Sequence, residues 1–155
     1  MKIYFLRHAH AGWPHWDGED DDRPLTEKGE AQSRRVADFL AANAINLDAI
    51  FHSPLPRAAR TASLIAERFR LPLVEEESLA PGFDAKKLAR ILASGVHGDV
   101  MIVGHESDFS ETIGQLTGGR VEMAKAGVAC VEVDKSLRGR LLWLVTPKLV
   151  ELAKT

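Results

Sequence analysis

Two histidines and two arginines stand where a binding pocket is expected to form. Arg7 and His8 directly follow one short apolar run of the sequence. Arg57 opens a helical pattern after a second run, and His105 directly follows another. Guanidinium groups match the oxygens of a phosphoryl group as bidentate donors and stay charged at physiological pH. Because an imidazole is partly neutral near pH 7, the set suits the binding and transfer of a phosphoryl group.

The charges around His8 favour a nucleophilic role. Nearby arginines are expected to lower the pKa of His8 and so favour its neutral form, whose lone pair can attack phosphorus. His105 is then available to donate a hydrogen bond to the transferring group. The helix N-termini expected near Arg57 and after His105 would add backbone N–H donors for an anion. Such preorganised charge is usually the dominant catalytic contribution in phosphoryl transfer.

Alternating strands and helices must hold these side chains. Apolar and branched runs predict strands at 3–6, 49–51, 71–74 and 100–103, and the last is expected to be central because it is almost wholly apolar. Helical spacing of apolar residues follows three expected N-caps, which are Thr26, Asp84, and Ser107 or Asp108. Two further strands, 128–133 and 141–145, flank a turn and predict a hairpin at the sheet edge.

This alternation predicts an α/β fold with three layers, a mainly parallel central sheet flanked by helices. In such sheets, sites form beyond the carboxyl ends of the strands. Arg7 and His8, Arg57, and His105 follow three different predicted strands. We therefore expect one pocket that contains all four side chains.

Composition bounds the class of protein. The chain has 155 residues, which predicts a single domain over 1–155, and its 45% apolar and 27% charged residues are typical of a globular protein. Lys and Arg total 20 against 22 Asp and Glu, and the net charge of −2 argues against a nucleic-acid binder.

The cysteine count and the distribution of apolar residues predict the cellular compartment. The single Cys130 cannot form an internal disulfide and is expected to be a buried strand residue. No apolar run approaches the roughly 18 residues of a membrane-spanning helix. The N-terminus becomes charged too early for a signal peptide. We expect a cytoplasmic protein without a membrane partner, and the sequence is compatible with a monomer without fixing the oligomeric state.

Four segments, in this order along the chain, resemble the motifs of one family. They are Leu6-Arg7-His8-Ala9, Arg23-Pro24-Leu25-Thr26-Glu27-Lys28-Gly29, Ser53-Pro54-Leu55-Pro56-Arg57-Ala58-Ala59-Arg60-Thr61-Ala62, and Val103-Gly104-His105. The family is the histidine phosphatase superfamily, whose fold is phosphoglycerate mutase-like. The modest length and the absence of large insertions most resemble its SixA-like phosphohistidine phosphatase branch.

The resemblance implies roles for individual residues. His8 would be the nucleophile that forms a phosphohistidine intermediate, which water then hydrolyses. Arg7 and Arg57 would bind the phosphate and His105 would complete the pocket, with Arg23 as a further phosphate ligand. No metal and no organic cofactor is implied. The partner would be a phosphorylated protein that carries phosphohistidine, or a small phosphoester.

Two departures from the family pattern affect the expected substrate. Ala9 replaces the usual glycine, and the family's general-acid carboxylate has no clear counterpart, although Glu77 is nearest to its place. An alkoxide leaving group benefits from a proton donor. Transfer from phosphohistidine to His8 exchanges one imidazole for another and needs less help. The missing acid therefore favours a phosphohistidine substrate.

Other chemistries find less support in the sequence. His8 and His10 beside an acidic loop resemble part of a metal site, but metal-dependent hydrolases with such pairs usually have larger barrels. A cysteine phosphatase needs an arginine six residues after its nucleophile, where Ser136 follows Cys130. The segment Gly104-His105-Glu106-Ser107-Asp108 lacks the final glycine of a serine hydrolase's nucleophile elbow.

Several alternatives stay open at this point. A phosphoprotein-binding module would keep the arginines without needing His8. A small-molecule phosphomonoesterase of the same superfamily would keep the whole pocket, and a mutase would need covering insertions for which the chain leaves little room. The acidic run at 17–22 is expected to be a solvated loop or a negative rim beside the pocket, with Trp13 and Trp16 packing within that loop.

Overall fold

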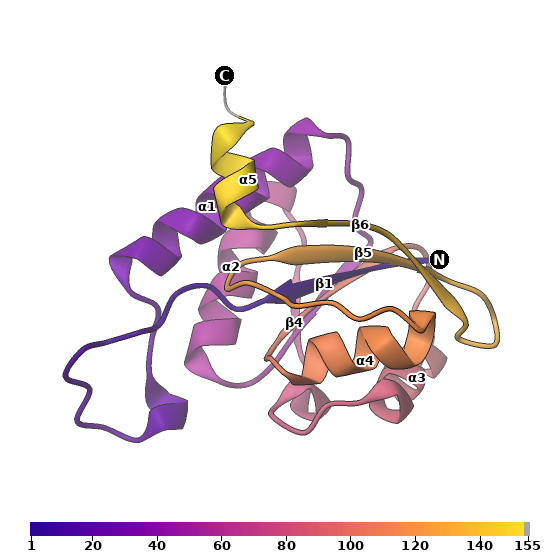
Figure 1. Ribbon diagram of the computed structural model, residues 1–155, viewed down its shortest axis with the longest axis horizontal. Helices are drawn as coiled ribbons and strands as arrows, with labels where there is room; N and C mark the ends of the chain where they lie inside the picture. The colour runs from indigo at the N-terminus through magenta and orange to yellow at the C-terminus, as the bar shows by residue number, and fades with distance from the viewer. Residues whose placement is uncertain (154–155) are drawn as a thin grey trace.

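A six-stranded mixed sheet forms the centre of the molecule (Figure 1). The computed structural model describes residues 1–153, and its strands lie in the order β3-β2-β4-β1-β5-β6. The strands are β1 (Lys2–Arg7), β2 (Ala49–His52), β3 (Leu73–Glu75), β4 (Val100–Gly104), β5 (Val128–Val133) and β6 (Gly139–Val145). The first four strands pair in parallel, whereas β5 and β6 add antiparallel pairs. This confirms the predicted α/β architecture, with its hairpin at the sheet edge.

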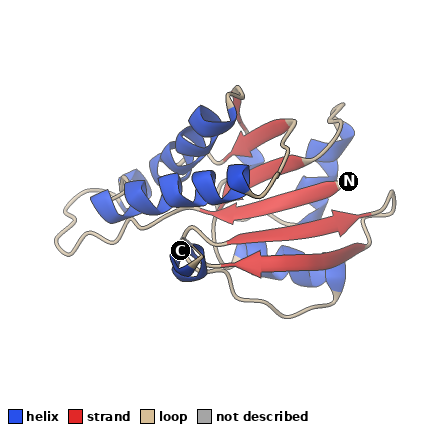
Figure 2. Ribbon diagram, turned by 90° about the horizontal axis from the view of Figure 1, so that it is seen from above, coloured by secondary structure: helices blue, strands red, loops and turns tan. Residues whose placement is uncertain are grey.

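Helices cover both faces of the sheet, so the fold has three layers (Figure 2). One face carries α1 (Glu27–Ala42) and α2 (Pro56–Phe69), with the short α5 (Pro147–Leu152) against α1. The other face carries α3 (Ala85–Ala93) and α4 (Asp108–Thr117). Two single-turn 3₁₀ helices, η1 (Asp20–Asp22) and η2 (Glu77–Leu79), lie in the connections.

Strand β4 shows how the sequence pattern builds the two cores. Met101 and Val103 join the core under α1 and α2, whereas Val100 and Ile102 join the core under α3 and α4. All four are fully buried, because successive side chains of a strand point to opposite faces and both faces are covered. The prediction of a central strand here is confirmed.

The third strand differs from its predicted range of 71–74, because β3 begins at Leu73. Arg70 adopts a left-handed conformation with φ 56°, and the Leu71 N–H donates to the Ala66 carbonyl oxygen at 3.2 Å. Leu71 therefore completes the C-terminal cap of α2 and packs partly buried against the core beneath that helix. Its apolar character comes from this cap and not from the strand.

Side chains cap the N-termini of three helices, α1, α3 and α5. Thr26 accepts from the Gly29 N–H and Asp84 accepts from the Lys87 N–H, which confirms both predicted caps. For α4, the predicted position of the N-cap at Ser107 is confirmed, but its side chain does not make the capping bond. The Glu106 Oε1 atom accepts from the Ser110 N–H at 2.8 Å instead.

Three further features of the fold are an unexpected C-terminal helix, the position of Cys130 and the character of the helices with respect to membranes. Helix α5 was not expected from the sequence; Thr146 caps it and Pro147 opens it. Cys130 is buried in β5, as predicted. Over the described part of the chain, none of the helices has the length and apolarity to cross a membrane.

Candidate active site

The carboxyl ends of β1, β2 and β4 bring the predicted residues together. The His8 N–H donates to the Gly104 carbonyl oxygen and the Ser53 N–H donates to the Val103 carbonyl oxygen, each at 3.0 Å. These bonds extend the parallel pairing beyond the strands, so the residues that follow β1 and β4 stay adjacent. The rings of His8 and His105 lie with their centroids 5.3 Å apart.

His8 is held as a neutral imidazole with one free nitrogen. Its Nδ1 atom lies 2.8 Å from the Ala9 carbonyl oxygen. Because a carbonyl oxygen only accepts, Nδ1 carries the proton and Nε2 keeps its lone pair. Burial lowers the pKa of His8 to about 3, assisted by the charges on His105, Arg57 and Arg7 and opposed by the hydrogen bond to Ala9. His8 is therefore a neutral candidate nucleophile at pH 7.

His105 is oriented by a buried serine. Its Nε2 atom lies 2.8 Å from the Ser53 Oγ atom, and Ser53 is fully buried. Burial lowers the pKa of His105 to about 4, with the charge of Arg57 acting in the same direction and the charges of Asp108 and Asp21 opposing it. The Nδ1 atom of His105 is buried and has no hydrogen-bond partner in the described structure.

Arg7 and Arg57 share the same incomplete bonding. The Nη1 atom of Arg7 donates to the Met123 carbonyl oxygen at 2.9 Å, and that of Arg57 donates to the Asp20 carbonyl oxygen at 3.2 Å. The Nε atoms of both guanidinium groups are buried and have no partner in the described structure. Burial lowers the pKa of both arginines. Buried donors without protein partners are rare in folded proteins, so these two nitrogens are available to an acceptor that binds in the pocket.

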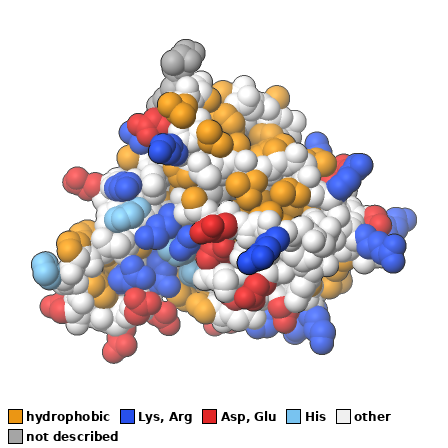
Figure 3. All heavy atoms as spheres, viewed as in Figure 1, with side chains coloured by type: hydrophobic (Ala, Val, Ile, Leu, Met, Phe, Trp, Pro, Cys, Tyr) orange, Lys and Arg blue, Asp and Glu red, His pale blue; other side chains and the backbone are white. Residues whose placement is uncertain are grey.

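These side chains line a pocket of about 340 Å³. Arg23 and Lys125 add positive charge to its wall, whereas Glu106 and Asp108 add two carboxylates. On the face shown in Figure 3, basic side chains gather around histidine, with acidic side chains to either side. Cations on this wall suit a phosphoryl group, but the carboxylates need a separate explanation.

Arg23 lies in the pocket lining and also pairs with the acidic turn η1. It lines the pocket, and its Nη1 atom donates to the Ala11 carbonyl oxygen. Its Nε atom also pairs with the Asp20 carboxylate at 2.9 Å. The acidic 3₁₀ turn η1 is solvent-exposed, yet it contacts two arginines of the pocket, Arg57 through the Asp20 backbone and Arg23 through the Asp20 side chain.

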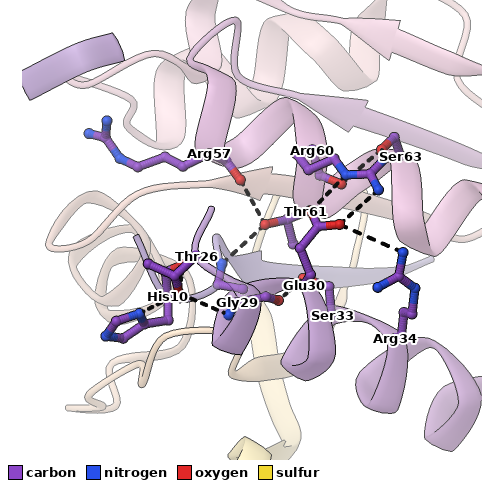
Figure 4. A network of polar contacts seen from close by, with 11 residues as sticks. His10, Thr26, Gly29, Glu30, Ser33, Arg34, Arg57, Arg60, Thr61 and Ser63 are labelled. Carbon is purple, nitrogen blue, oxygen red and sulfur yellow. Dashed lines mark hydrogen bonds and ion pairs between the residues drawn. The ribbon is translucent and has the colours of Figure 1, made fainter. Parts of the chain in front are cut away.

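A second set of contacts fixes the backbone beside His8 (Figure 4). The Thr61 hydroxyl donates to the Arg57 carbonyl oxygen at 2.7 Å and accepts from the Ala9 N–H at 3.1 Å. A Cβ atom on Gly29 would lie 2.2 Å from the His10 carbonyl oxygen, so this position of α1 admits only glycine. The chain that follows the candidate nucleophile is thereby attached to both α2 and α1.

Other polar residues of the sequence lie elsewhere. Glu77, the nearest candidate for a general acid, is exposed on η2 and is not among the residues that line the pocket. His10 binds the Thr26 hydroxyl at 2.7 Å, and His15 is exposed. Within residues 1–153, no three His, Cys, Asp or Glu side chains cluster closely enough to hold a metal ion.

The sequence reasoning missed four polar residues of the site, which are Ser53, Glu106, Asp108 and Lys125. Signals for three of them were present. Ser53 opens the second motif, and Glu106 and Asp108 follow His105 by one and three residues. Lys125 had no such signal, because the loop before β5 reaches the pocket only through the pairing of β5 with β1.

The two tryptophans of the loop before α1, Trp13 and Trp16, are held within that loop through their indole N–H groups. Trp13 donates to the Pro24 carbonyl oxygen and Trp16 donates to the Glu19 carbonyl oxygen, each at 2.8 Å. Their rings are nevertheless 41% and 36% exposed. The two rings also lie with their centroids 6.4 Å apart, so the expected packing within the loop is confirmed although both side chains stay partly exposed.

An α/β sheet with two neutral imidazoles and several guanidinium groups beyond its strand ends defines a phosphoryl-handling class of protein. The family model described as histidine phosphatase superfamily (branch 1) matches residues 3–80, and the chain belongs to this family. It falls in the SixA-like branch and is a phosphatase of that superfamily.

Individual relatives agree with this placement. An uncharacterized protein of Picosynechococcus is 31% identical, with 96% of this chain and 98% of the relative covered. Phosphohistidine phosphatase SixA of Escherichia coli is 25% identical, with 99% of both chains covered. A solved structure of the protein histidine phosphatase SixA complexed with tungstate shares the fold at a TM-score of 0.86 and 24% identity, covering 97% of this chain and 99% of that one.

Proposed function

We propose that this protein removes the phosphoryl group from phosphohistidine in a protein, through a covalent intermediate on His8. One observation carries the proposal. Three buried polar atoms have no partner among residues 1–153, the Nε atoms of Arg7 and Arg57 and the Nδ1 atom of His105, and all belong to side chains that line the pocket with His8. Such atoms are costly to bury unless an acceptor binds them in the working state. A phosphoryl group supplies three acceptor oxygens.

The first step is transfer to His8. The two arginines bind the phosphoryl oxygens, and the Nε2 lone pair of His8 forms a bond to phosphorus. The bond between phosphorus and the leaving nitrogen breaks, and its electron pair stays on that nitrogen. As His8 becomes positively charged, its Nδ1–H bond to the Ala9 carbonyl oxygen strengthens and stabilises the charge.

His105 assists as a hydrogen-bond donor. A Ser53 hydroxyl that donates to Nε2 of His105 leaves the proton of the neutral ring on Nδ1, the atom that has no partner in the described structure. This Nδ1–H can then bind a phosphoryl oxygen. Because burial and nearby arginine charge hold the pKa of His105 at about 4, the ring performs this role without being protonated at pH 7.

Hydrolysis of the intermediate completes the cycle. A water oxygen forms a bond to phosphorus, and the electron pair of the N–P bond returns to Nε2 of His8. Both protons of the water leave with the product as dihydrogen phosphate, and His8 regains its neutral form with the proton on Nδ1. No external proton donor is required in either step when the ring of the phosphohistidine substrate is already protonated on its other nitrogen, because it then leaves as a neutral imidazole.

Two observations support phosphohistidine as the substrate, the position of Glu77 outside the pocket lining and the name of one relative. Glu77 is exposed and does not line it, so a carboxylic acid for an alkoxide leaving group is not supplied from η2. The Escherichia coli relative, aligned over 99% of both chains, is named a phosphohistidine phosphatase. A small-molecule phosphomonoesterase and a phosphoprotein-binding module remain the alternatives that the experiment must separate.

The test is to trap the intermediate and compare substrates. Wild type and His8→Ala are mixed with a histidine-phosphorylated protein or with a small alkyl phosphate. We expect acid-labile phosphate on His8 by mass spectrometry and faster turnover of the protein substrate. Normal turnover by His8→Ala would overturn the mechanism. Faster cleavage of the alkyl phosphate would overturn the substrate, and binding without turnover would favour the binding module.

A further inference from the structure

Two carboxylates in the wall of a phosphate-binding pocket are electrostatically unexpected, because each repels the phosphoryl group. The oxygens of Glu106 are both occupied. Oε1 accepts from the Ser110 N–H at 2.8 Å, and Oε2 accepts from the Met123 N–H at 3.2 Å. Since the Met123 carbonyl oxygen in turn binds Arg7, Glu106 has a structural role that explains its position.

Asp108 differs because only half of its carboxylate is used. Its Oδ2 atom accepts from the N–H groups of Gly82 and Phe83, at 2.8 and 3.2 Å. Its Oδ1 atom accepts no hydrogen bond from the side chains and backbone described over 1–153. The two backbone donors fix the orientation of the carboxylate, and the Phe109 N–H bond to the His105 carbonyl oxygen fixes the start of α4. Asp108 is therefore a rigid anion with one free oxygen.

The free oxygen shares the pocket with donors that also lack partners. His105 and Arg57 are 5% and 6% exposed, each has a buried side-chain nitrogen with no partner among residues 1–153, and both line the pocket with Asp108. His105 and Asp108 both line this pocket, and they lie three residues apart at the start of α4. A ligand that satisfies this wall must offer an anionic group to the arginines and a hydrogen-bond donor, preferably cationic, to Asp108.

We propose that Asp108 is a specificity-determining residue that binds the ring N–H of a protonated phosphoimidazole leaving group. This inference rests on the proposed function and names the part of the substrate that the pocket selects. In its protonated form, a phosphoimidazole carries its phosphoryl group on one ring nitrogen and a proton on the other. It therefore combines the anion and the cationic donor in one small group, whereas a phosphate ester has only the anion.

The charges balance through the transfer without a proton changing place. At the start the substrate ring carries the positive charge, and its N–H donates to Asp108. The Nε2 lone pair of His8 forms the new bond to phosphorus, and the electron pair of the old N–P bond stays on the substrate ring, which leaves neutral with its proton. The positive charge is now on His8, whose Nδ1–H donates to the Ala9 carbonyl oxygen. Asp108 and Ala9 thus hold equivalent protons on the two rings.

The experiment compares two small substrates, so that recognition of a protein surface does not enter. One is phosphoimidazole, and the other is p-nitrophenyl phosphate, whose leaving group needs no proton. Asp108→Asn retains a side-chain oxygen for Gly82 and Phe83 but removes the charge. We expect the ratio of kcat/KM for phosphoimidazole to that for the aryl phosphate to fall about 10- to 100-fold, the range of a charge-assisted hydrogen bond.

Matched variants separate the possible outcomes. Glu111→Gln removes an exposed carboxylate from the same helix, outside the pocket lining, and should leave the ratio unchanged. An equal loss for both substrates in Asp108→Asn, or no change in the ratio, overturns the proposal and reduces Asp108 to a structural group. His8→Ala tests the proposed function separately, because it should abolish turnover of both substrates whatever Asp108 does.

Discussion

Arg57 and Arg60 lie on the same helix, less than one turn apart, yet their surroundings are opposite (Figure 4). Arg60 is exposed and fully paired. Its Nε and Nη2 atoms donate to both carboxylate oxygens of Glu30, at 2.7 and 2.8 Å. Arg57 is buried, its Nε atom has no partner in the described structure, and its Nη1 atom holds only the backbone oxygen of Asp20.

A helix selected for stability alone would have the reverse arrangement. A buried charge without full pairing costs free energy, whereas the paired arginine at the surface contributes little because water screens it. The contrast supports the proposed role of Arg57 as a phosphate ligand, whereas Arg60 joins α2 to α1 through Glu30. Each prediction below tests this difference between the two sides of the helix.

The largest expected effect is on catalysis. Arg57→Ala removes a preorganised phosphate ligand, and we expect kcat/KM to fall by roughly 100- to 1,000-fold, the usual cost of one such donor. Arg60→Ala should change kcat/KM by less than about twofold, because exposed ion pairs contribute little. Steady-state kinetics on a histidine-phosphorylated protein measures both. Comparable losses in the two variants would remove the functional distinction between them.

Thr61 lies beside Arg60 in sequence but belongs to the pocket side of α2. Thr61→Val keeps the shape of the side chain and removes the hydroxyl that accepts from the Ala9 N–H, so a buried donor is left without a partner. We expect the free energy of unfolding to fall by about 1–3 kcal/mol. Urea denaturation measures this change, and Ser63→Ala on the exposed side of α2 is the matched control. A cost below that of the control would mean that Thr61 does not fix the backbone at Ala9.

The pocket side should also give the protein its sensitivity to acid. Burial lowers the folded-state pKa of His8 to about 3 and that of His105 to about 4, well below the roughly 6.5 of an unfolded chain. In this window the unfolded chain binds more protons, so stability is complete above about pH 6.5 and falls as the pH is lowered towards those values. Each ring can contribute a slope of up to about 1.4 kcal/mol per pH unit.

Urea denaturation at pH 7, 6 and 5, without phosphate, measures that slope. Replacing both rings, as in His8→Asn with His105→Asn, should flatten the decline in stability. Arg60→Gln should leave the slope as it is in the wild type, because the exposed pair does not involve either ring. An unchanged slope in the double histidine variant would place the acid sensitivity elsewhere in the molecule.

The smallest effect is expected for the Glu30–Arg60 pair itself. The side chains of Arg60 and Glu30 are 46% and 26% exposed, so Glu30→Gln should lower the free energy of unfolding by only about 0.2–1 kcal/mol. Because salt screens exposed charges, the difference from wild type should shrink between low and high ionic strength. A cost of several kcal/mol that persists at high salt would show that Arg60 is as critical to α2 as Arg57 is to the pocket.

The same contrast explains what could be read from the sequence. Arg7, His8, Arg57 and His105 follow strand ends, and a parallel sheet brings strand ends together whatever the details of its packing. The core pattern of β4 is similarly local, because alternation alone assigns its residues to two faces. These features follow from periodicity and position along the chain.

Other features depend on partners that are distant in the sequence. The sequence does not predict the hydrogen bonds of Ser53 to His105 or of Thr61 to Ala9, because these partners come together only in the folded chain. Asp108 looks like a helix cap, but its carboxylate turns to the backbone at Gly82 and Phe83. In each case several donors and acceptors are available along the chain, and only the tertiary arrangement decides which of them pair.

The double attachment of the chain beside His8 has a consequence for how such a protein can change over generations. Thr61 holds this chain at Ala9, and Gly29 with Thr26 holds it at His10, so both attachments lie outside the segment 12–22. Within that segment, the contact to Arg57 is made by a backbone oxygen, which any amino acid can provide. Most residues of this segment at the pocket rim can therefore be substituted, which would allow new binding partners, while the side chains of the candidate active site beneath it keep their positions.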